Sequence, residues 1–473
     1  MNILFVEDHP TFGRDFAELM GQIDGVQKLI LAKSKEAAFA ALDTQFFDLI
    51  VLDLTIPEND AALEVAKENG QAVFYKAIAE RPGTSIFILT GSEMDDFTKS
   101  LARHGEKLDL WGANTPINTL DYFEKEAADR ILPEVERIAL EVRAVNCIAI
   151  NSGGRDLCLS PGFERCIRVV ARRLGASSAD IASLSGGFSR ARVLRVNMRD
   201  KLGRVIYSTV AKLGAVSDID AELTAYNRDA KRLPLGAFPP LADQITKGGY
   251  GDGGIFYTVA EAYGRSLFKV LHESDEAAAN VVRALREGMK VWIENYEFRR
   301  MKVSEVRRRF LWDEDFEKIK GKFNLDLDLI EESDADVRIS CIHGDLHGAN
   351  VLVNLDEKPV LIDFGDVGEG ASCYDPITLE LSSVFHPEGK NNALHDLLIP
   401  ILSRWPSRDE YERDHPFPNF SFACREWAHE VGGSDRGVLA TVYAYLIRQL
   451  RFETVSSEVT LRVLGSVIAR LQQ

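Results

Sequence analysis

Residues 341–366 read CIHGDLHGANVLVNLDEKPVLIDFGD, and they combine short apolar runs with several oxygen-bearing side chains. The runs NVLVNL and PVLIDF predict two strands that are joined by a turn at DEK. Asp345 and Asn350 lie on the approach to the first strand, and Asp363 ends the second. Such a hairpin gathers three oxygen-bearing side chains at one end of a small sheet. This set suits Mg²⁺, which takes oxygen ligands from one or two protein groups and from substrate phosphates.

The composition of the chain is that of an ordinary globular protein. Its 473 residues predict two or three domains, and its net charge of −17 argues against a binder of nucleic acid or of anionic membranes. The six cysteines contain no C-x-x-C pair and predict reduced thiols. No stretch reads as a membrane span or a signal peptide, so we expect a cytoplasmic, bacterial protein.

The first 120 residues alternate strands with helical patterns. The strand-like runs are NILFVED, KLILA, FDLIVLDL, TSIFILTG and KLDLWGA. Near-continuous apolar strands of this kind predict a parallel sheet that is covered on both faces, with its functional crevice at the carboxyl ends of the strands. Glu7, Asp8, Asp53 and Thr90 all follow or end strands at that edge.

With VED, DLIVLDLTIP and ILTGS in this order, residues 1–120 resemble a response-regulator receiver domain. The resemblance implies a flavodoxin-like α/β fold, a phospho-acceptor at Asp53, an acidic Mg²⁺ pocket with Glu7 and Asp8, and a switch hydroxyl at Thr90. It also implies a histidine kinase or another signalling partner.

One position departs from the receiver pattern. The resemblance implies a lysine followed by proline after the fifth strand, where this sequence has Thr115 before Pro116 in ANTPI. Two alternatives therefore stay open: Asp53 accepts a phosphoryl group, or the receiver serves only for docking or dimerisation.

Residues 121–182 read as a helical connector. Apolar positions recur every three or four residues from Leu120 to Val142 and predict an amphipathic helix, and PGFERCIRVVARRLG predicts another. The connector could transmit a signal or pair with its copy in a homodimer, and a packed spacer is the alternative.

The next segment carries features that suit a nucleotide. The turn at Gly186 and Gly187 lets backbone amides approach a phosphate closely. Lys212 lies inside the apolar strand TVAKLG, where a buried ammonium needs an anionic partner. Glu222 on the following helix is the predicted carboxylate partner, and Asp220 is its rival.

Residues 253–271, GGIFYTVAEAYGRSLFKVL, predict a strand, a short linker and a helix. A two-lobed nucleotide site needs such a hinge, and backbone groups around Glu261 are placed to read the adenine edge. With these parts in order, residues 183–473 resemble the aminoglycoside phosphotransferase and choline kinase family. That resemblance implies an α+β, two-lobed protein-kinase-like domain with lobes at 183–260 and 261–473.

The HGDLHGANVLV and LIDFGD motifs carry most of this resemblance. It implies that ATP and Mg²⁺ are used to transfer the γ-phosphate to a hydroxyl of a small molecule. Asp345 would orient that hydroxyl, Asn350 and Asp363 would hold Mg²⁺, and Lys212 would steady the phosphates. Asp375, in YDPITLELS, would brace the catalytic region. The fused receiver would regulate the transfer.

The same residues admit other interpretations. His343 and His347 are four apart, but a zinc site of the H-E-x-x-H kind needs a helix, and HGDLHG contains loop-forming glycines. A glycosidase that uses two carboxylates leaves Asn350 and Lys212 unexplained. A pseudokinase or nucleotide-sensing module stays open, and so does a kinase that acts on a protein hydroxyl.

The acceptor is the least defined part of the prediction. In the family, C-terminal helices form much of the acceptor pocket, and here these would include SFACREWAHEV and RGVLATVYAYLIRQLRFE. Glu426, Glu430 and Asp435 could meet a cationic amino sugar or amino alcohol, although ordinary surface charge is the alternative reading.

Overall fold

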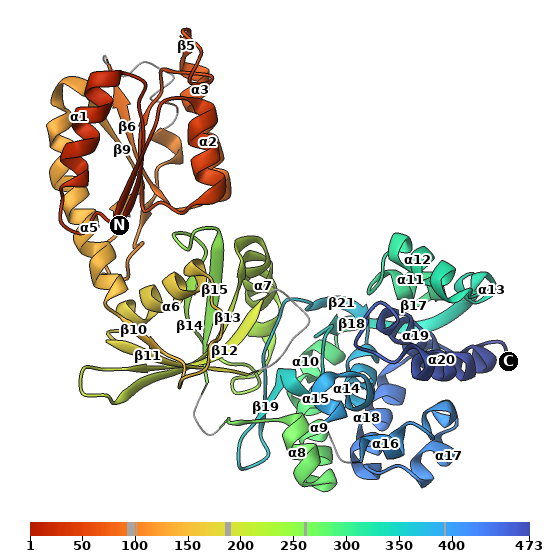
Figure 1. The fold of residues 1–473 in the computed structure, drawn as a ribbon. Coiled ribbons are helices and arrows are strands. Elements are labelled where there is room, and N and C mark those ends of the chain that lie inside the picture. Colours follow the sequence, from red (N-terminus) through yellow and green to blue (C-terminus); the bar gives the residue numbers. More distant parts are fainter. Residues whose placement is uncertain (92–99, 101, 185–190, 260–262, 392–393) are drawn as a thin grey trace. The chain divides into compact units, whose positions relative to one another are not determined.

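The structure is a computed structural model. It describes all residues except 92–99, 101, 185–190, 260–262 and 392–393. The chain divides into two compact units (Figure 1). The first unit contains Met1–Asp220 and Leu241–Thr258, and the second contains Ala221–Pro240 and Val259–Gln473.

The first unit begins with a five-stranded parallel sheet in the order β2-β1-β3-β6-β9. Its strands are β1 (Asn2–Val6), β2 (Lys28–Ala32), β3 (Leu49–Asp53), β6 (Ser85–Thr90) and β9 (Leu120–Glu124). The helices around it are α1 (Pro10–Gly21), α2 (Lys35–Thr44), α3 (Lys67–Glu80) and α5 (Ile131–Asn146). In Figure 1, α1 and α5 cover one face and α2 and α3 cover the other, which confirms the predicted receiver-like fold.

The fifth strand of this sheet differs from the prediction. Residues 107–113 were expected to form it, but β7 (Lys107–Leu108) pairs only with β8 (Ile117–Asn118) in a separate hairpin. The fifth strand is β9, so the predicted boundary at residue 120 falls at its first residue. Leu120 and Phe123 are three apart, a spacing that fits a helix, and this edge strand is only partly buried, so its strand pattern is weak.

A six-stranded sheet follows in the same unit, in the order β10-β11-β12-β13-β15-β14. Its strands are β10 (Ala149–Asn151), β11 (Ser178–Ser183), β12 (Arg192–Arg199), β13 (Val205–Ala215), β14 (Leu241–Ile245) and β15 (Asp252–Thr258). The helix α6 (Pro161–Arg173) lies between β10 and β11, and α7 (Val216–Arg228) follows β13. The predicted connector therefore contributes two strands to this sheet, in addition to its helices.

One hydrophobic cluster joins the receiver to this second sheet. It runs from the β1 and β3 side chains through α5 and α6 to β12, β13 and β15. Val142 of α5 and Val170 of α6 are fully or almost fully buried within it. The predicted helical connector is thus part of a continuous core that both sheets share.

The second unit is mostly helical. Its helices are α8 (Leu267–Glu273), α9 (Asp275–Gly288), α10 (Lys290–Ile293), α11 (Val303–Arg308), α12 (Asp313–Phe323), α13 (Asp328–Glu331), α14 (Tyr374–Phe385), α15 (Pro387–Lys390), α16 (His395–Leu398), α17 (Arg408–Arg413), α18 (Pro418–Val431), α19 (Asp435–Gln449) and α20 (Ser457–Leu471). All residues of α14 are buried, and so are most of α19, so these two helices lie in the core.

Two three-stranded sheets complete the second unit, in the orders β16-β19-β20 and β17-β18-β21. The strands are β16 (Arg265–Ser266), β17 (Glu297–Lys302), β18 (Asp334–Ile342), β19 (Val351–Val353), β20 (Pro359–Leu361) and β21 (Gly368–Ala371). β19 and β20 are antiparallel, with Val351 opposite Leu361, as the hairpin prediction requires.

All six cysteines are free thiols, as predicted. Within the described part of the chain, no helix combines the length and the apolar character needed to span a membrane.

Candidate active site and receiver pocket

Asp345 lies in the loop between β18 and β19, and the start of this loop is fixed by a buried carboxylate. Asp375, in the first turn of α14, accepts hydrogen bonds from the backbone N–H of His343 at 2.7 Å and of Gly344 at 3.0 Å. Gly344 has φ of +81°, and a Cβ there would lie 2.4 Å from the carbonyl oxygen of Asp366. Only glycine fits this position, and Asp375 makes the bracing contacts that its predicted role requires.

Asn350 connects Asp345 to the strand that precedes Asp363. Its side-chain Nδ2 donates to the backbone carbonyl oxygen of Asp345 at 2.9 Å. The backbone carbonyl oxygen of Asn350 accepts a hydrogen bond from Ile362 N at 3.0 Å. Asp363 follows β20 with φ of 67°, a strained conformation that clusters at functional sites in proteins. Because the side-chain nitrogen of Asn350 already donates a hydrogen bond, its side-chain oxygen is the atom that can coordinate a cation. An amide and a carboxylate oxygen fit Mg²⁺.

The two histidines of the motif are enclosed by protein. His343 is fully buried, and its Nε2 lies 3.1 Å from the carbonyl oxygen of Ile362, in keeping with the predicted structural role. His347 Nε2 is 3.6 Å from Asp345 Oδ2, and burial lowers the pKa of this imidazole. His347 therefore favours its neutral form and helps to order the loop beside Asp345.

Arg448, near the end of α19, contacts the same loop and was not singled out in the sequence. Its Nη1 lies 3.5 Å from Asp345 Oδ1 and 3.1 Å from the hydroxyl of Tyr374, and its Nη2 lies 4.0 Å from Asp366 Oδ2. No motif announces this residue, because it is one polar position in a helix that is otherwise almost wholly buried.

The predicted nucleotide-side residues fall in both units. Lys212 is half-buried on β13, opposite Val193 and Ile255, in the first unit. Glu222, in the part of α7 that belongs to the second unit, is fully buried, and its Oε1 accepts from Phe364 N at 3.4 Å. Because they lie in different units, their pairing stays a prediction.

Asp220, the rival of Glu222, is exposed, so burial favours Glu222 as the partner of a buried cation. Gly186, Gly187 and Glu261 lie outside the described residues, and their nucleotide roles stay predictions.

In the receiver, Glu7, Asp8 and Asp53 come together as predicted. Each offers a carboxylate oxygen, and these oxygens all lie within 4.8 Å of one another. Thr90 ends β6, the strand next to β3, and its hydroxyl is 3.5 Å from the carbonyl oxygen of Phe123. Three carboxylates with these separations form a donor set that fits Mg²⁺.

Lys125 corrects the prediction that the receiver lacks its lysine. It follows β9 directly, and its Nζ lies 2.7 Å from Asp53 Oδ2 and 2.8 Å from Glu7 Oε2. Thr115 does not occupy this position, because the fifth strand of the sheet is β9 and not residues 107–113. The signal in the sequence was a lysine immediately after the run LDYFE.

Burial and Lys125 act on the pocket in opposite directions. Burial raises the pKa of Glu7 and of Asp53, and hydrogen bonds from Lys125 partly offset this. Burial alone would lower the pKa of Lys125, but its bonds to Asp53 and Glu7 outweigh that effect and the pKa is raised. The lysine thus stays charged and stabilises two ionised carboxylates.

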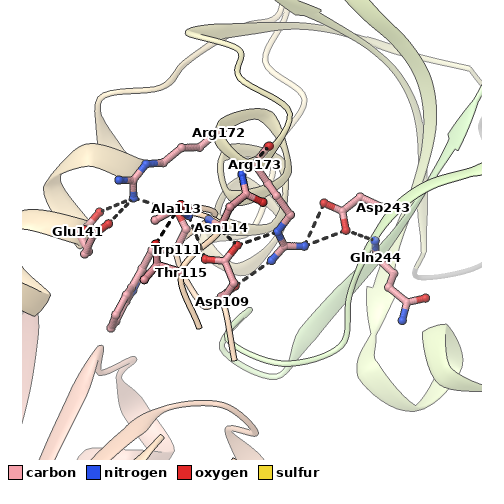
Figure 2. A network of polar contacts seen from close by, with 10 residues as sticks. All are labelled: Asp109, Trp111, Ala113, Asn114, Thr115, Glu141, Arg172, Arg173, Asp243 and Gln244. Atoms are coloured by element: carbon pink, nitrogen blue, oxygen red, sulfur yellow. Dashed lines mark hydrogen bonds and ion pairs between the residues drawn. The ribbon is translucent and has the colours of Figure 1, made fainter. Parts of the chain in front are cut away.

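A polar network ties the receiver to the second sheet of the first unit (Figure 2). Arg173 of α6 donates to both carboxylate oxygens of Asp243 in β14, at 2.8 and 2.9 Å. The same guanidinium donates to Asp109 of the receiver, at 3.0 Å to Oδ2 and 2.8 Å to the carbonyl oxygen. Asn114 Nδ2 donates back to the carbonyl oxygen of Arg173 at 3.2 Å.

The neighbouring Arg172 holds another part of the receiver. Its Nη1 donates to Glu141 Oε2 of α5 at 2.7 Å and to the carbonyl oxygen of Trp111 at 3.0 Å (Figure 2). Two consecutive arginines of α6 therefore make hydrogen bonds with the receiver segment 109–114.

A second contact lies at the amino end of β3. Arg165 of α6 is buried and pairs with Asp48 Oδ1 at 2.6 Å, and the Tyr250 hydroxyl donates to the same oxygen at 2.6 Å. The Tyr250 ring stacks on Phe46 of the receiver with ring centroids 5.1 Å apart. Asp48 is five residues before Asp53, so one strand connects this contact to the acidic pocket.

Two parts of the chain are similar to known proteins. Residues 191–393 match the model of the phosphotransferase enzyme family, and this region contains Lys212, Asp345, Asn350 and Asp363. The transcriptional regulatory protein MalR of Bacillus subtilis is 28% identical over 105 residues. That alignment covers 22% of this chain and spans 41% of the length of MalR.

Solved structures with similarity fall into the same two groups. A CheY-like receiver domain from Methanospirillum hungatei is 21% identical, with a TM-score of 0.22, and the match covers 30% of this chain and 96% of that one. Aminoglycoside phosphotransferase APH(4)-Ia with ADP and hygromycin B is 14% identical, with a TM-score of 0.38, covering 62% and 94%. The amicoumacin kinase hAmiN is 12% identical, with a TM-score of 0.33, covering 62% and 88%.

The chain therefore contains a receiver-like α/β domain and, at residues 191–393, a region that matches the phosphotransferase enzyme family.

Proposed function

We propose that this protein is an ATP- and Mg²⁺-dependent phosphotransferase that moves the γ-phosphate of ATP to a hydroxyl group of a small molecule. The observation that carries the proposal is the loop at residues 343–350. Asp375 fixes its start through two backbone N–H groups, and Asn350 ties Asp345 to the strand before Asp363. The family match over residues 191–393 supports the same activity.

The side chains take complementary roles in this proposal. Asp345 orients the acceptor hydroxyl and accepts its proton, and its side chain is 35% exposed, so it is open to a substrate. Asn350 and Asp363 supply oxygen ligands, and Lys212 steadies the nucleotide phosphates. When bound, Mg²⁺ would offset the negative charge of those phosphates. Phosphoryl transfer needs little covalent chemistry from the protein, so positioning and charge stabilisation account for most of the catalysis.

The test is transfer of labelled γ-phosphate from Mg²⁺-ATP into a cell extract that contains both small molecules and proteins. The full-length chain should label a small molecule, and the Asp345→Asn variant should do so roughly 100- to 10,000-fold more slowly. Label in a protein would instead support a kinase that acts on protein hydroxyls. ATP binding without any label would favour a nucleotide-sensing module and overturn the proposed activity.

For the receiver, we propose that Asp53 accepts a phosphoryl group from a signalling partner and that this changes nucleotide binding by the sheet that carries Lys212. The support is the continuity of the first unit. β3 runs from the contact at Asp48 to Asp53, roughly 16 Å at the usual rise per residue, and α6 fixes the receiver to β14.

This regulation is tested with acetyl phosphate, a small phosphodonor that replaces the unknown partner. Its addition with Mg²⁺ should change the ATP affinity of the full-length chain, and the Asp53→Asn variant should not respond. Equal ATP affinity of the phosphorylated and unphosphorylated chain would show that the receiver serves docking alone.

A further inference from the structure

Arg448 stands out in the second unit because one guanidinium reaches Asp345, in the loop at residues 343–350, and a second carboxylate, Asp366, which follows β20. It lies 3.5 Å from Asp345 Oδ1 and 4.0 Å from Asp366 Oδ2. The other oxygen of Asp345 lies 3.6 Å from His347 Nε2. Both oxygens of the Asp345 carboxylate therefore have a neighbour, one from the loop itself and one from the distant helix α19.

The position of the guanidinium is itself fixed. Arg448 Nη1 bonds to the Tyr374 hydroxyl at 3.1 Å, and the Tyr374 ring stacks on Phe310 with centroids 3.5 Å apart and planes at 6°. Tyr374 is fully buried. A buried aromatic ring packed in this way has little freedom, so its hydroxyl is a stable anchor for the arginine.

Adjacent residues of α14 then reach the loop by two routes. Asp375 bonds to the backbone at His343 and Gly344, and Tyr374 acts on the side chain of Asp345 through Arg448. The first route fixes where the loop begins, and the second fixes how the carboxylate is turned. The phenol, the carboxylate of Asp345 and that of Asp366 raise the pKa of Arg448, so its charge persists.

We propose that Arg448 is a positioning residue, which holds the Asp345 carboxylate in the orientation that accepts the substrate hydroxyl. This inference rests on the proposed phosphotransferase function. Arg448 donates hydrogen bonds and keeps its proton, so it takes no part as a base. It acts through Asp345: Nη1 contacts both the Asp345 carboxylate and the Tyr374 hydroxyl, and Nη2 faces Asp366. The planar guanidinium holds these two nitrogens in a fixed relation, which the single ammonium of a lysine does not.

The experiment measures the rate of labelled γ-phosphate transfer into the small-molecule fraction of a cell extract at saturating Mg²⁺-ATP. Arg448→Met should lower this rate by about 100-fold, the cost of a misplaced catalytic group, with ATP affinity unchanged within about twofold. Arg448→Lys should retain part of the rate. Tyr374→Phe keeps the stacked ring but removes the anchoring hydroxyl, and it should give a smaller loss than Arg448→Met.

Arg451 supplies the matched control. It follows the same helix, is exposed, and lies 3.7 Å from Asp315, so Arg451→Gln removes the same charge outside the loop. This variant should transfer label at the wild-type rate. A loss equal to that of Arg448→Met would show a general charge effect and overturn the positioning role.

A double-mutant cycle separates positioning from mere support of the fold. If Arg448 acts through Asp345, then Arg448→Met should add no further loss of transfer in an Asp345→Asn background. Losses that multiply would overturn the inference while the proposed function stands. Absence of label from the wild-type chain would overturn the proposed function, and this role with it.

Discussion

The receiver pocket, formed by Glu7, Asp8 and Asp53, and the loop at residues 343–350 each pair a carboxylate with a cation, but the pairing distances differ. Each places carboxylates at strand ends, and each receives a cation from far along the chain: Lys125 is 72 residues from Asp53, and Arg448 is 103 residues from Asp345. The lysine makes ion pairs of 2.7 and 2.8 Å to buried carboxylates, whereas the arginine lies 3.5 Å from an aspartate that is 35% exposed.

The difference indicates two uses of the same arrangement. A close pair between buried groups resists rearrangement, so the receiver pocket should respond only when a phosphoryl group or Mg²⁺ changes its charge. The looser pair at Asp345 leaves that carboxylate accessible while it limits its rotation. The first arrangement suits a switch, and the second suits a site that must admit a new substrate molecule in every turnover.

The largest expected effect distinguishes the roles of two carboxylates of the candidate active site, Asp345 and Asp363. Asp363→Ala should weaken Mg²⁺-dependent binding of ATP by at least about 100-fold, because it removes a ligand outright. Asp345→Asn should bind ATP normally but lose roughly 100- to 10,000-fold in transfer rate, because it removes the group that accepts the proton. Isothermal calorimetry and label transfer measure the two effects. Equal loss of ATP binding in both variants would contradict the roles assigned here.

The next effect concerns Lys125 and the stability of the receiver. Lys125→Met should lower the free energy of unfolding by about 3 kcal/mol at neutral pH, since it leaves Asp53 and Glu7 buried without their cation. It should also abolish the response to acetyl phosphate. Urea unfolding measures the first effect. Lys33→Met is the control, because this exposed lysine has no ion pair to Asp53 or Glu7 among the described contacts.

The pH dependence of the unfolding free energy of Lys125→Met provides a further test, and its direction can be predicted. Burial raises the pKa of Asp53 and Glu7, so they take up protons in the folded state before the unfolded chain does. Loss of the cation raises these pKa values further, so the variant gains more stability than the wild type as pH falls. The difference in unfolding free energy should shrink between pH 7 and pH 4. A difference that stays constant would show that Lys125 stabilises the receiver by packing alone.

The carboxylates at both sites could be predicted from the sequence because they lie in short motifs beside apolar runs. Asp345, Asn350 and Asp363 are within one hairpin, and Glu7 and Asp53 end strands that share one sheet edge. Proximity then follows from local structure. The positions of Lys125 and Arg448 beside these carboxylates depend instead on tertiary structure, about which sequence spacing carries no information.

The error at the fifth strand shows the same limit. Residues 107–113 are as apolar as β9, and the choice between them depends on which segment reaches the edge of the sheet beside β6. A lysine directly after LDYFE was the available signal. For Arg448, no comparable signal exists, because it is one polar position in a helix that is otherwise almost wholly buried.

Two of the three acidic residues that were predicted to meet a cationic acceptor, Glu430 and Asp435, pair with other side chains. Glu430 pairs with Arg286, and Asp435 lies 3.3 Å from His429 at the surface. The charge that the structure places beside Asp345 from these helices is positive. The basis for expecting a cationic acceptor therefore weakens, and the labelled product of the transfer assay, separated on cation- and anion-exchange resins, would decide it.

The smallest expected effect tests the link between the two regions. Arg173→Ala should lower the free energy of unfolding by about 2 kcal/mol, because it removes charge-assisted hydrogen bonds to Asp243 and Asp109 that are largely shielded from solvent. Arg143→Ala, which removes an exposed pair with Asp24, should cost under about 0.5 kcal/mol. The informative measurement is the response of ATP affinity to acetyl phosphate. If Arg173→Ala keeps the full response, the signal does not pass through β14, and the strand from Asp48 to Asp53 becomes the route to test. If the response is lost while acetyl phosphate still labels Asp53, then the hydrogen bonds of Arg173 couple the receiver pocket to the sheet that carries Lys212.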